Sequence, residues 1–291
     1  MEELHCIHAA NAILGEGPSW DPSRGVLYWV DIHRPAVFRW QPGLGQTGHW
    51  PMPRPIGCVA PTQSGRLIFA DADGFGILDP ASGEISRIAD TEKDRAHNRF
   101  NDGKVDRAGR FWGGTMDNQC LQATGSLYRV DRDLSVHCLD SGFICSNGIG
   151  WSPDNQTMYV TDSMVRTICA YEFDLGSGAM GPRRVFAQLS DRDGYPDGLT
   201  VDSEGFVWSA VWDGWRLIRY APDGAIEREI RMPVQRPSSC MFGDPDLKTL
   251  FITSACVELG WSALKEGPLA GGLFALRTRV AGLPEMPFGA C

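Results

Sequence analysis

Six strand-like segments recur along this chain at nearly regular intervals. They begin at residues 26, 66, 110, 157, 205 and 249 and read VLYWVDI, RLIFADAD, RFWGGTM, TMYVTDS, GFVWSAV and TLFITSA. Consecutive segments therefore start 40, 44, 47, 48 and 44 residues apart. Repeats of about 40 to 50 residues are typical of the four-stranded blades of a propeller. The spacing predicts an all-β fold, a six-bladed β-propeller.

A second apolar run and a turn follow each segment, as in AVFRWQPGLG, FGILDPASGE and RLIRYAPDGA. Apolar and polar residues alternate in several of these runs, as half-buried strands require. In the turns DPASG, APDG and LGSG, Asp or Ser can bond its own backbone and Gly can take a positive φ. A β-sandwich or a pair of smaller β domains is the alternative fold, and the regular period argues against it.

We expect the whole chain, residues 1–291, to form one propeller domain. The segment from Leu4 to Ala9 is expected to add a strand to the last blade, because closing the ring in this way protects the sheet edges. The last ten residues or so are expected to form a loose tail.

Composition argues against several classes of function. The formal net charge is −9, and no Lys/Arg cluster is longer than PRR near Arg183, so a nucleic-acid partner is not expected. No run of 18 apolar residues is present, and the N-terminus lacks the apolar region of a secretory signal. Nine cysteines without a C-x-x-C pair suit a reducing compartment. We therefore expect a cytoplasmic protein that needs neither a membrane nor an obligatory protein partner.

Most of the six segments are preceded by a turn whose first residue is Asp, Ser or Thr. Counting five residues back from that first residue gives an equivalent position in each repeat. In the sixth repeat, SSCMFGDPD aligns with SNGIGWSPD and supplies the equivalent position. These positions, which we call the ring positions, hold Glu16, Gly57, Asn101, Asn147, Asp197 and Ser239.

Equivalent positions of a closed propeller surround one axis, so the ring positions should meet at one mouth of the central channel. Two carboxylates and two amides that point inward are unfavourable unless they are paired or bind a cation. Hard divalent cations prefer such oxygen ligands. The pattern predicts a central metal site. The alternative is that the Asp-Gly and Asn-Gly pairs only form turns.

Several stretches spread over nearly the whole chain match one known family: LGEGPSWD, NRFNDGKVDRAGRFWGGTM, SNGIGWSPD, YPDGLTVDSEGFVW, CMFGDPDLKTLFITSA and LAGGLFAL. On these motifs the chain resembles the gluconolactonase/regucalcin (senescence-marker-protein-like) family. Members of that family have a six-bladed propeller and hydrolyse sugar lactones with one divalent metal. The resemblance therefore implies the same fold, and a small-molecule sugar lactone as substrate.

The resemblance also implies roles for individual residues. By motif, the metal ligands are Glu16, Asn147 and Asp197, whereas Asn101 lies near the metal and touches the substrate. Arg99 corresponds to the family's substrate-binding arginine. One departure lies in GTMDNQC, where Gln119 stands at a position that is a substrate-binding carboxylate in some members. A neutral amide there would change how sugar hydroxyls are recognised.

The hypothesis for the reaction is hydrolysis of an aldonolactone to the aldonic acid, with Asp197 accepting a proton from the attacking water. The cation could be Ca²⁺, Mg²⁺, Mn²⁺, Zn²⁺ or Fe²⁺, since all accept oxygen ligands. Two other functions stay open. One is a metal-dependent esterase or phosphotriesterase on the same scaffold, and the other is a propeller that binds calcium without catalysis.

Overall fold

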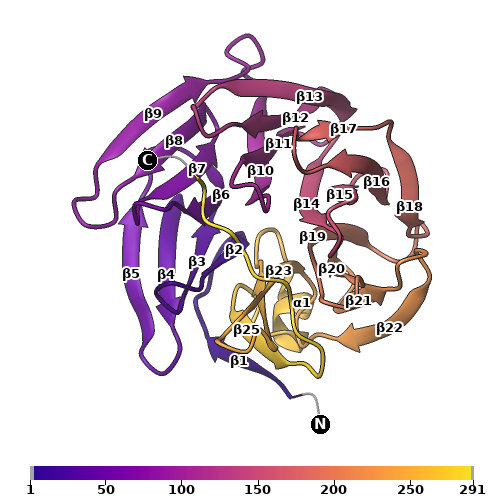
Figure 1. Cartoon of the computed structure of the whole chain (residues 1–291). Helices are drawn as coiled ribbons and strands as arrows, with labels where there is room; N and C mark the ends of the chain where they lie inside the picture. The colour runs from indigo at the N-terminus through magenta and orange to yellow at the C-terminus, as the bar shows by residue number, and fades with distance from the viewer. Residues whose placement is uncertain (1–2, 290–291) are drawn as a thin grey trace.

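Six antiparallel sheets stand around a central axis like the blades of a propeller (Figure 1). The computed structural model describes residues 3–289. Blade one contains β2 (Gly15–Asp21), β3 (Val26–Asp31), β4 (Ala36–Gln41) and β5 (Gly45–Pro51). Blade two contains β6 (Ile56–Pro61), β7 (Leu67–Asp71), β8 (Gly74–Leu78) and β9 (Ile85–Asp90). Blade three contains β10 (Asn98–Val105), β11 (Phe111–Asp117), β12 (Gly125–Val130) and β13 (Val136–Phe143).

The other three blades follow the same order from the inner strand outward. Blade four contains β14 (Ser146–Trp151), β15 (Thr157–Asp162), β16 (Thr167–Asp174), β17 (Ala179–Met180) and β18 (Arg184–Gln188). Blade five contains β19 (Tyr195–Val201), β20 (Val207–Trp212), β21 (Arg216–Tyr220) and β22 (Ile226–Arg231). Blade six contains β23 (Pro237–Gly243), β24 (Thr249–Ser254), β25 (Leu273–Arg277) and, as its outer strand, β1 (Leu4–His8). The predicted six-bladed propeller is confirmed.

The N-terminal strand closes the ring. β1 pairs antiparallel with β25, with Leu4 opposite Leu276 and Cys6 opposite Phe274. Figure 1 shows this pairing as an indigo strand beside a yellow one. The last blade is therefore built from both ends of the chain, as the sequence predicts.

The hydrophobic core lies between neighbouring blades rather than in one central mass. In β7, Leu67 and Phe69 pack in the cluster between blades one and two, whereas Ile68 and Ala70 pack in the cluster between blades two and three. Successive side chains of a strand point to opposite faces of the sheet, so a strand with blades on both sides is apolar throughout. Six such clusters, one at each interface, hold the ring together.

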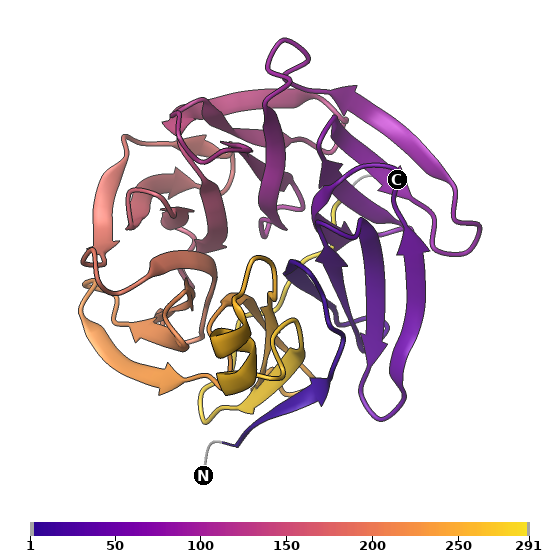
Figure 2. The ribbon, with the colours of Figure 1, turned by 180° about the vertical axis from the view of Figure 1, so that it is seen from behind.

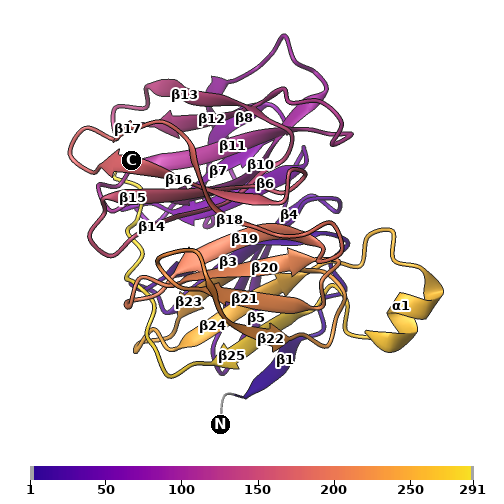
Figure 3. The same ribbon diagram turned by 90° about the vertical axis from the view of Figure 1, so that its right-hand side faces the viewer.

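In each blade the inner strand begins at one mouth of the central channel. The second strand runs antiparallel to the inner strand, so it ends at the same mouth. The connections between second and third strands therefore lie at this same mouth, which we call the site face. The longest of them joins β24 to β25 and contains the only helix among residues 3–289, α1 (Trp261–Glu266). Figure 3 shows α1 projecting from the ring. No helix in this range is long and apolar enough to cross a membrane.

The C-terminal segment crosses the opposite mouth. Phe288 lies beside Thr62, just after β6, and Gly282 pairs with Asp202, just after β19. Figure 1 shows this yellow segment running in front of the centre of the ring, and Figure 2 shows it from behind. The Phe288 side chain is fully buried. The expectation of a loose tail is therefore wrong for residues 282–289, because apolar burial and backbone hydrogen bonds fix them; residues 290–291 lie outside the described range.

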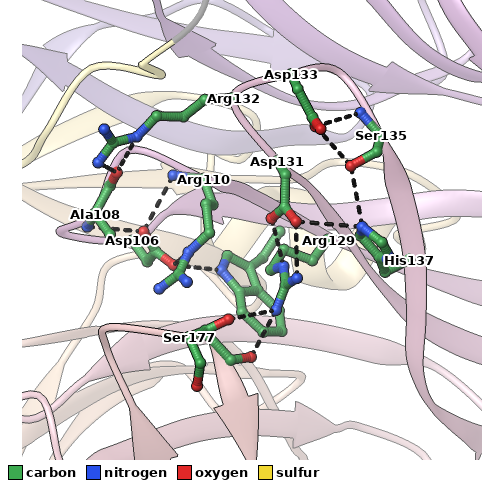
Figure 4. A network of polar contacts seen from close by, with 12 residues as sticks. Asp106, Ala108, Arg110, Arg129, Asp131, Arg132, Asp133, Ser135, His137 and Ser177 are labelled. Carbon is green, nitrogen blue, oxygen red and sulfur yellow. Dashed lines mark hydrogen bonds and ion pairs between the residues drawn. The ribbon is translucent and has the colours of Figure 1, made fainter.

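The turn-opening aspartates stabilise the sharp turns after the inner strands. Asp106 Oδ1 accepts hydrogen bonds from the backbone N–H groups of Ala108 and Arg110, and its Oδ2 accepts from Arg110 Nε at 2.6 Å and from Trp112 Nε1 at 2.9 Å. Figure 4 shows this carboxylate within a wider polar network that includes Arg129. Asp202 makes the same contacts with Trp208 and Arg219 in blade five. These buried carboxylates are structural and do not face the site.

Candidate active site

The ring positions coincide with an irregularity in every inner strand. The pairing register with the second strand shifts between Glu16 and Ser19, Ile56 and Cys58, Phe100 and Asp102, Asn147 and Ile149, Pro196 and Leu199, and Pro237 and Ser239. A bulge re-aims the side chain at which it occurs. The bulges lie at one level of the ring, and in four blades they carry the polar ring residues that face the central cavity, Glu16, Asn101, Asn147 and Asp197.

The glycines that follow two ring positions let the inner strands approach one another. A Cβ on Gly148 would lie 2.5 Å from the backbone nitrogen of Leu199 in the next blade. A Cβ on Gly198 would lie 2.7 Å from Cα of Ser239. Both glycines are inside strands, β14 and β19. The alternative that these Asn-Gly and Asp-Gly pairs merely form turns is therefore wrong.

Four of the six ring residues line one cavity of about 310 Å³ at the site face: Glu16, Asn101, Asn147 and Asp197. Arg99 lines it too. The other two ring residues, Gly57 and Ser239, are not among its lining residues. The rest of the wall comes from Leu14, Met116, Cys120, Cys145, Ser163, Met164, Tyr195 and Trp212.

Three buried carboxyl groups lie close enough to influence one another. Burial, and after it the charge of Asp102, raises the pKa of Glu16 to about 8. Burial also raises the pKa of Asp102 to about 6. Burial, followed by the charges of Glu16 and Asp102, raises the pKa of Asp197 well above its usual range. Desolvation and mutual repulsion both disfavour the charged forms of these carboxyl groups, and a bound cation would instead favour the charged forms.

Two buried oxygens at the ring accept no hydrogen bond. Asn147 Oδ1 and Asp197 Oδ1 both lack a partner. The Asn147 amide is oriented, because its Nδ2 donates to Ser163 Oγ at 3.2 Å and Ser163 Oγ donates to the Pro196 carbonyl at 2.7 Å. Unpartnered buried oxygens are unfavourable unless an ion or a water satisfies them.

The donor set fits a hard divalent cation. Glu16, Asn147 and Asp197 would offer two carboxylates and one amide oxygen, and oxygen ligands are what Ca²⁺ and Mg²⁺ prefer. No group of three His, Cys, Asp or Glu side chains that could hold a metal is found among residues 3–289. A cation at this site would therefore depend on the Asn147 amide oxygen as well as on the two carboxylates.

Arg99 and Asn101 are linked in a chain of hydrogen bonds. Arg99 Nη1 donates to Asn101 Oδ1 at 2.6 Å and to the Phe100 carbonyl at 3.0 Å. Asn101 Nδ2 donates to the Ser146 carbonyl at 3.0 Å, one residue before Asn147. Arg99 is buried, and it is the cation in the cavity wall. Asn101 thus holds Arg99 in place and ties it to the strand that carries Asn147.

Gln119 lies apart from the cavity. Its side chain is exposed, and the next residue, Cys120, lines the cavity instead. The turn after β11 explains this, because Asp117 accepts hydrogen bonds from the backbone N–H groups of Gln119, Leu121 and Gln122 and so fixes the direction of the loop. The substrate-binding role expected for Gln119 has no contact in this structure to support it.

Sequence reasoning missed the apolar part of the wall. Cys120, Met164 and Trp212 come from or adjoin the connections between second and third strands. These connections differ in length and composition between blades, so no repeat identifies their residues. One signal was available: such connections lie at the same mouth as the ring positions once a propeller is predicted.

Residues 14–256 match the protein family described as SMP-30/gluconolactonase/LRE-like region. The chain is 37% identical to an L-arabinolactonase of Azospirillum brasilense, covering 99% of this chain and 98% of the relative. It is 36% identical to a 6-deoxy-6-sulfogluconolactonase of Pseudomonas putida, covering 99% of both chains. A solved structure of a calcium-binding protein, regucalcin, from Agrobacterium tumefaciens superposes with a TM-score of 0.94 at 28% identity, covering 99% of this chain and 97% of that one.

Proposed function

Since this chain belongs to the SMP-30/gluconolactonase/LRE-like family, we propose that it is an enzyme that hydrolyses sugar lactones to aldonic acids with the help of one divalent cation. The observation that carries the proposal is the pair of unpartnered buried oxygens, Asn147 Oδ1 and Asp197 Oδ1, in the same cavity as Glu16 and Arg99. Lactonases among the relatives support the reaction class. A relative described as calcium-binding supports the cation.

Glu16, Asn147 and Asp197 would hold the cation. Such an ion supplies Lewis acidity to a carbonyl oxygen and acidity to a water molecule. The carboxyl groups of Glu16 and Asp197, whose pKa values burial raises, would ionise more readily beside such a positive charge.

Asp197 acts as the general base. Its carboxylate accepts a proton from the water that attacks the lactone carbonyl carbon. The ring C–O bond then breaks, the leaving ring oxygen takes up the proton held by Asp197 and becomes the free hydroxyl, and the new carboxyl group of the aldonic acid releases its own proton to solvent. To do so Asp197 must be ionised, and its raised pKa in the ion-free cavity makes this dependent on a nearby positive charge.

Arg99 binds and orients the lactone. Its guanidinium is the cationic group in the cavity wall and is fixed by Asn101 and the Phe100 carbonyl. It donates hydrogen bonds to the substrate oxygens and stabilises the negative charge that develops on them. Asn101 contacts the substrate and positions Arg99.

The test is a pH-indicator assay over a panel of aldonolactones, run on metal-stripped protein to which each divalent cation is restored in turn. The proposal expects acid release from at least one sugar lactone, and only when a cation is present. Aryl esters and phosphotriesters in the same panel test the alternative hydrolase. Hydrolysis of these without any lactone, or no hydrolysis of either class with any cation, would overturn the proposal.

A further inference from the structure

A buried carboxylate lies just before the inner strand of blade three. Glu92 belongs to the connection between β9 and β10, which leads into the site face, and its side chain is only 6% exposed. Its backbone has a φ of +60°, a conformation that is unfavourable for residues other than glycine. Such a conformation persists where surrounding contacts fix it. The contacts of the carboxylate supply that constraint.

The Glu92 carboxylate accepts hydrogen bonds from side chains of three strands of blade three. Oε2 accepts from Asn98 Nδ2 of β10 at 2.8 Å. Oε1 accepts from the Tyr128 hydroxyl of β12 at 2.8 Å and from Thr115 Oγ1 of β11 at 3.2 Å. Hydrogen bonds to an ionised group are stronger than those between neutral groups. One side chain therefore ties the connection to all three of these strands.

Asn98 is held from its other side as well. Its Nδ2 also donates to the Thr124 carbonyl at 3.0 Å, and its Oδ1 accepts from Thr124 Oγ1 at 2.7 Å. Its backbone N–H donates to the Arg95 carbonyl at 2.8 Å. These bonds fix the orientation of the amide at the residue immediately before Arg99.

The three partners of the carboxylate surround Arg99. Asn98 precedes it in β10, and Thr115 pairs with Phe100, which follows it. The Tyr128 ring lies 5.7 Å from the Phe100 ring, centroid to centroid. The Phe100 carbonyl in turn accepts a hydrogen bond from Arg99 Nη1 at 3.0 Å. The backbone on both sides of Arg99 is thus fixed by groups that bind one carboxylate.

We propose that Glu92 is a positioning residue for Arg99. By fixing the residues on either side of Arg99, the carboxylate sets the direction in which the guanidinium enters the cavity. Glu92 is not among the residues that line the cavity, so it acts through Arg99 and not on a substrate. The consequence for lactone binding rests on the proposed function, whereas the placement of Arg99 does not.

Glu92→Gln is the informative change, because it keeps the size of the side chain and replaces one accepting oxygen by an NH₂ group. That group faces either Asn98 Nδ2 or the Tyr128 hydroxyl. The Asn98 amide cannot turn over, since Thr124 fixes it, and the hydroxyl can adapt only by giving up its own acceptor. Glu84→Gln is the matched control, because Glu84 is an exposed residue of the turn before β9.

Crystal structures of the wild type and both variants test the placement directly. In Glu92→Gln, Arg99 Nη1 should move out of hydrogen-bonding distance of Asn101 Oδ1, which it contacts at 2.6 Å. In Glu84→Gln this contact should be unchanged. An unmoved Arg99 in Glu92→Gln would overturn the inference. If Glu92→Gln does not fold, Tyr128→Phe, which removes one donor and keeps the ring, decides by the same criterion.

Kinetics separate positioning from a purely structural role. With a lactone that is hydrolysed, Glu92→Gln should raise KM and lower kcat/KM by about tenfold to 10²-fold, the size of effect that a small misplacement of a binding group has. Loss of folded enzyme alone would lower the apparent kcat and leave KM unchanged, and that result would overturn the positioning role.

A double variant tests whether the effect passes through Arg99. Glu92→Gln should cause no further loss of kcat/KM when it is added to Arg99→Ala, because an effect that acts through a side chain disappears with that side chain. Losses that add would overturn the inference. Failure of the wild type to hydrolyse any lactone would instead remove the proposed function, and the crystal structures would still decide whether Glu92 positions Arg99.

Discussion

Asp197 must satisfy two opposing requirements. As the proposed general base it has to be ionised, yet it is buried beside Glu16 and Asp102, and that environment raises its pKa well above the usual range. In the proposed function, a divalent cation held by Glu16, Asn147 and Asp197 would resolve the conflict, because it would compensate the charges and satisfy the unpartnered oxygens. In this proposal the same side chain links ion binding to catalysis.

Asp197→Asn removes the base and keeps the size of the side chain. We expect kcat for the best lactone of the panel to fall by about 10²- to 10⁴-fold, the range in which general bases contribute. The matched control is Asp191→Asn, since the Asp191 side chain is 94% exposed. Circular dichroism should show both variants folded. Wild-type turnover by folded Asp197→Asn would show that another group accepts the proton.

At the scale of single elements, the inner strand is the unit that builds the site. Each has a bulge at its ring position, a close contact with the next inner strand, and a sharp turn at its far end. In blades three and five, a buried aspartate, Asp106 or Asp202, holds that turn through backbone N–H groups, an arginine and a tryptophan. The aspartates stabilise the strands without facing the cavity.

Asp106→Ala should therefore destabilise the fold and spare the chemistry. It leaves Arg110 buried without its carboxylate partner, and breaking a buried ion pair in this way costs about 3 to 5 kcal/mol. Urea unfolding followed by tryptophan fluorescence measures the loss. Asp133→Ala is the control, because Asp133 is an exposed turn residue that bonds only within its own turn, and its effect should stay below about 1 kcal/mol. Equal effects of the two substitutions would contradict the structural role.

Phe288→Ala tests the C-terminal segment that sequence reasoning expected to be loose. Phe288 is fully buried in the cluster between blades two and three, and truncating a buried Phe costs about 3 to 5 kcal/mol. Met286→Ala is the control, since Met286 is exposed. An unchanged free energy of unfolding in Phe288→Ala would mean that the segment is loose after all.

At the scale of the whole molecule, the repeat predicts most of the architecture. A regular spacing of strands fixes the number of blades, and equivalent positions of a closed ring have to meet at its axis. That geometry brought Glu16, Asn147 and Asp197 together from spacing alone. The bulges that aim these side chains were not predicted, because their sequence signal, a small residue beside a polar one, is shared with turns.

Features outside the repeat could not be predicted in the same way. The apolar wall of the cavity comes largely from connections whose lengths differ between blades, and Gln119 and Cys120 show the consequence. Gln119 and Cys120 are adjacent in the chain, and only one of them reaches the cavity. Which one does so depends on how Asp117 caps the turn after β11. The C-terminal segment likewise has no counterpart in other repeats, so its packing across the channel has no periodic signal.

Stability should depend on pH and cation together. In ion-free protein, the pKa of Glu16 is raised to about 8 and that of Asp197 is raised as well, so the folded state binds protons more tightly than the unfolded state. Their contribution is therefore fully present below the ordinary carboxyl range and is lost as pH rises toward about 8. With chelator present, Tm should fall over this interval. Added Ca²⁺ should raise Tm more at about pH 8 than at about pH 5, because protonated carboxyl groups bind cations poorly. An equal rise in Tm on addition of Ca²⁺ at both pH values would contradict this prediction.

In the proposed function, the inner strands direct oxygen atoms of Glu16, Asn147 and Asp197 to one divalent cation. Anomalous diffraction from crystals soaked in Mn²⁺ locates such an ion directly. The account predicts one strong peak in the cavity at the site face, within coordination distance of all three side chains. No peak there at saturating Mn²⁺, or an ion held by other residues, would contradict it.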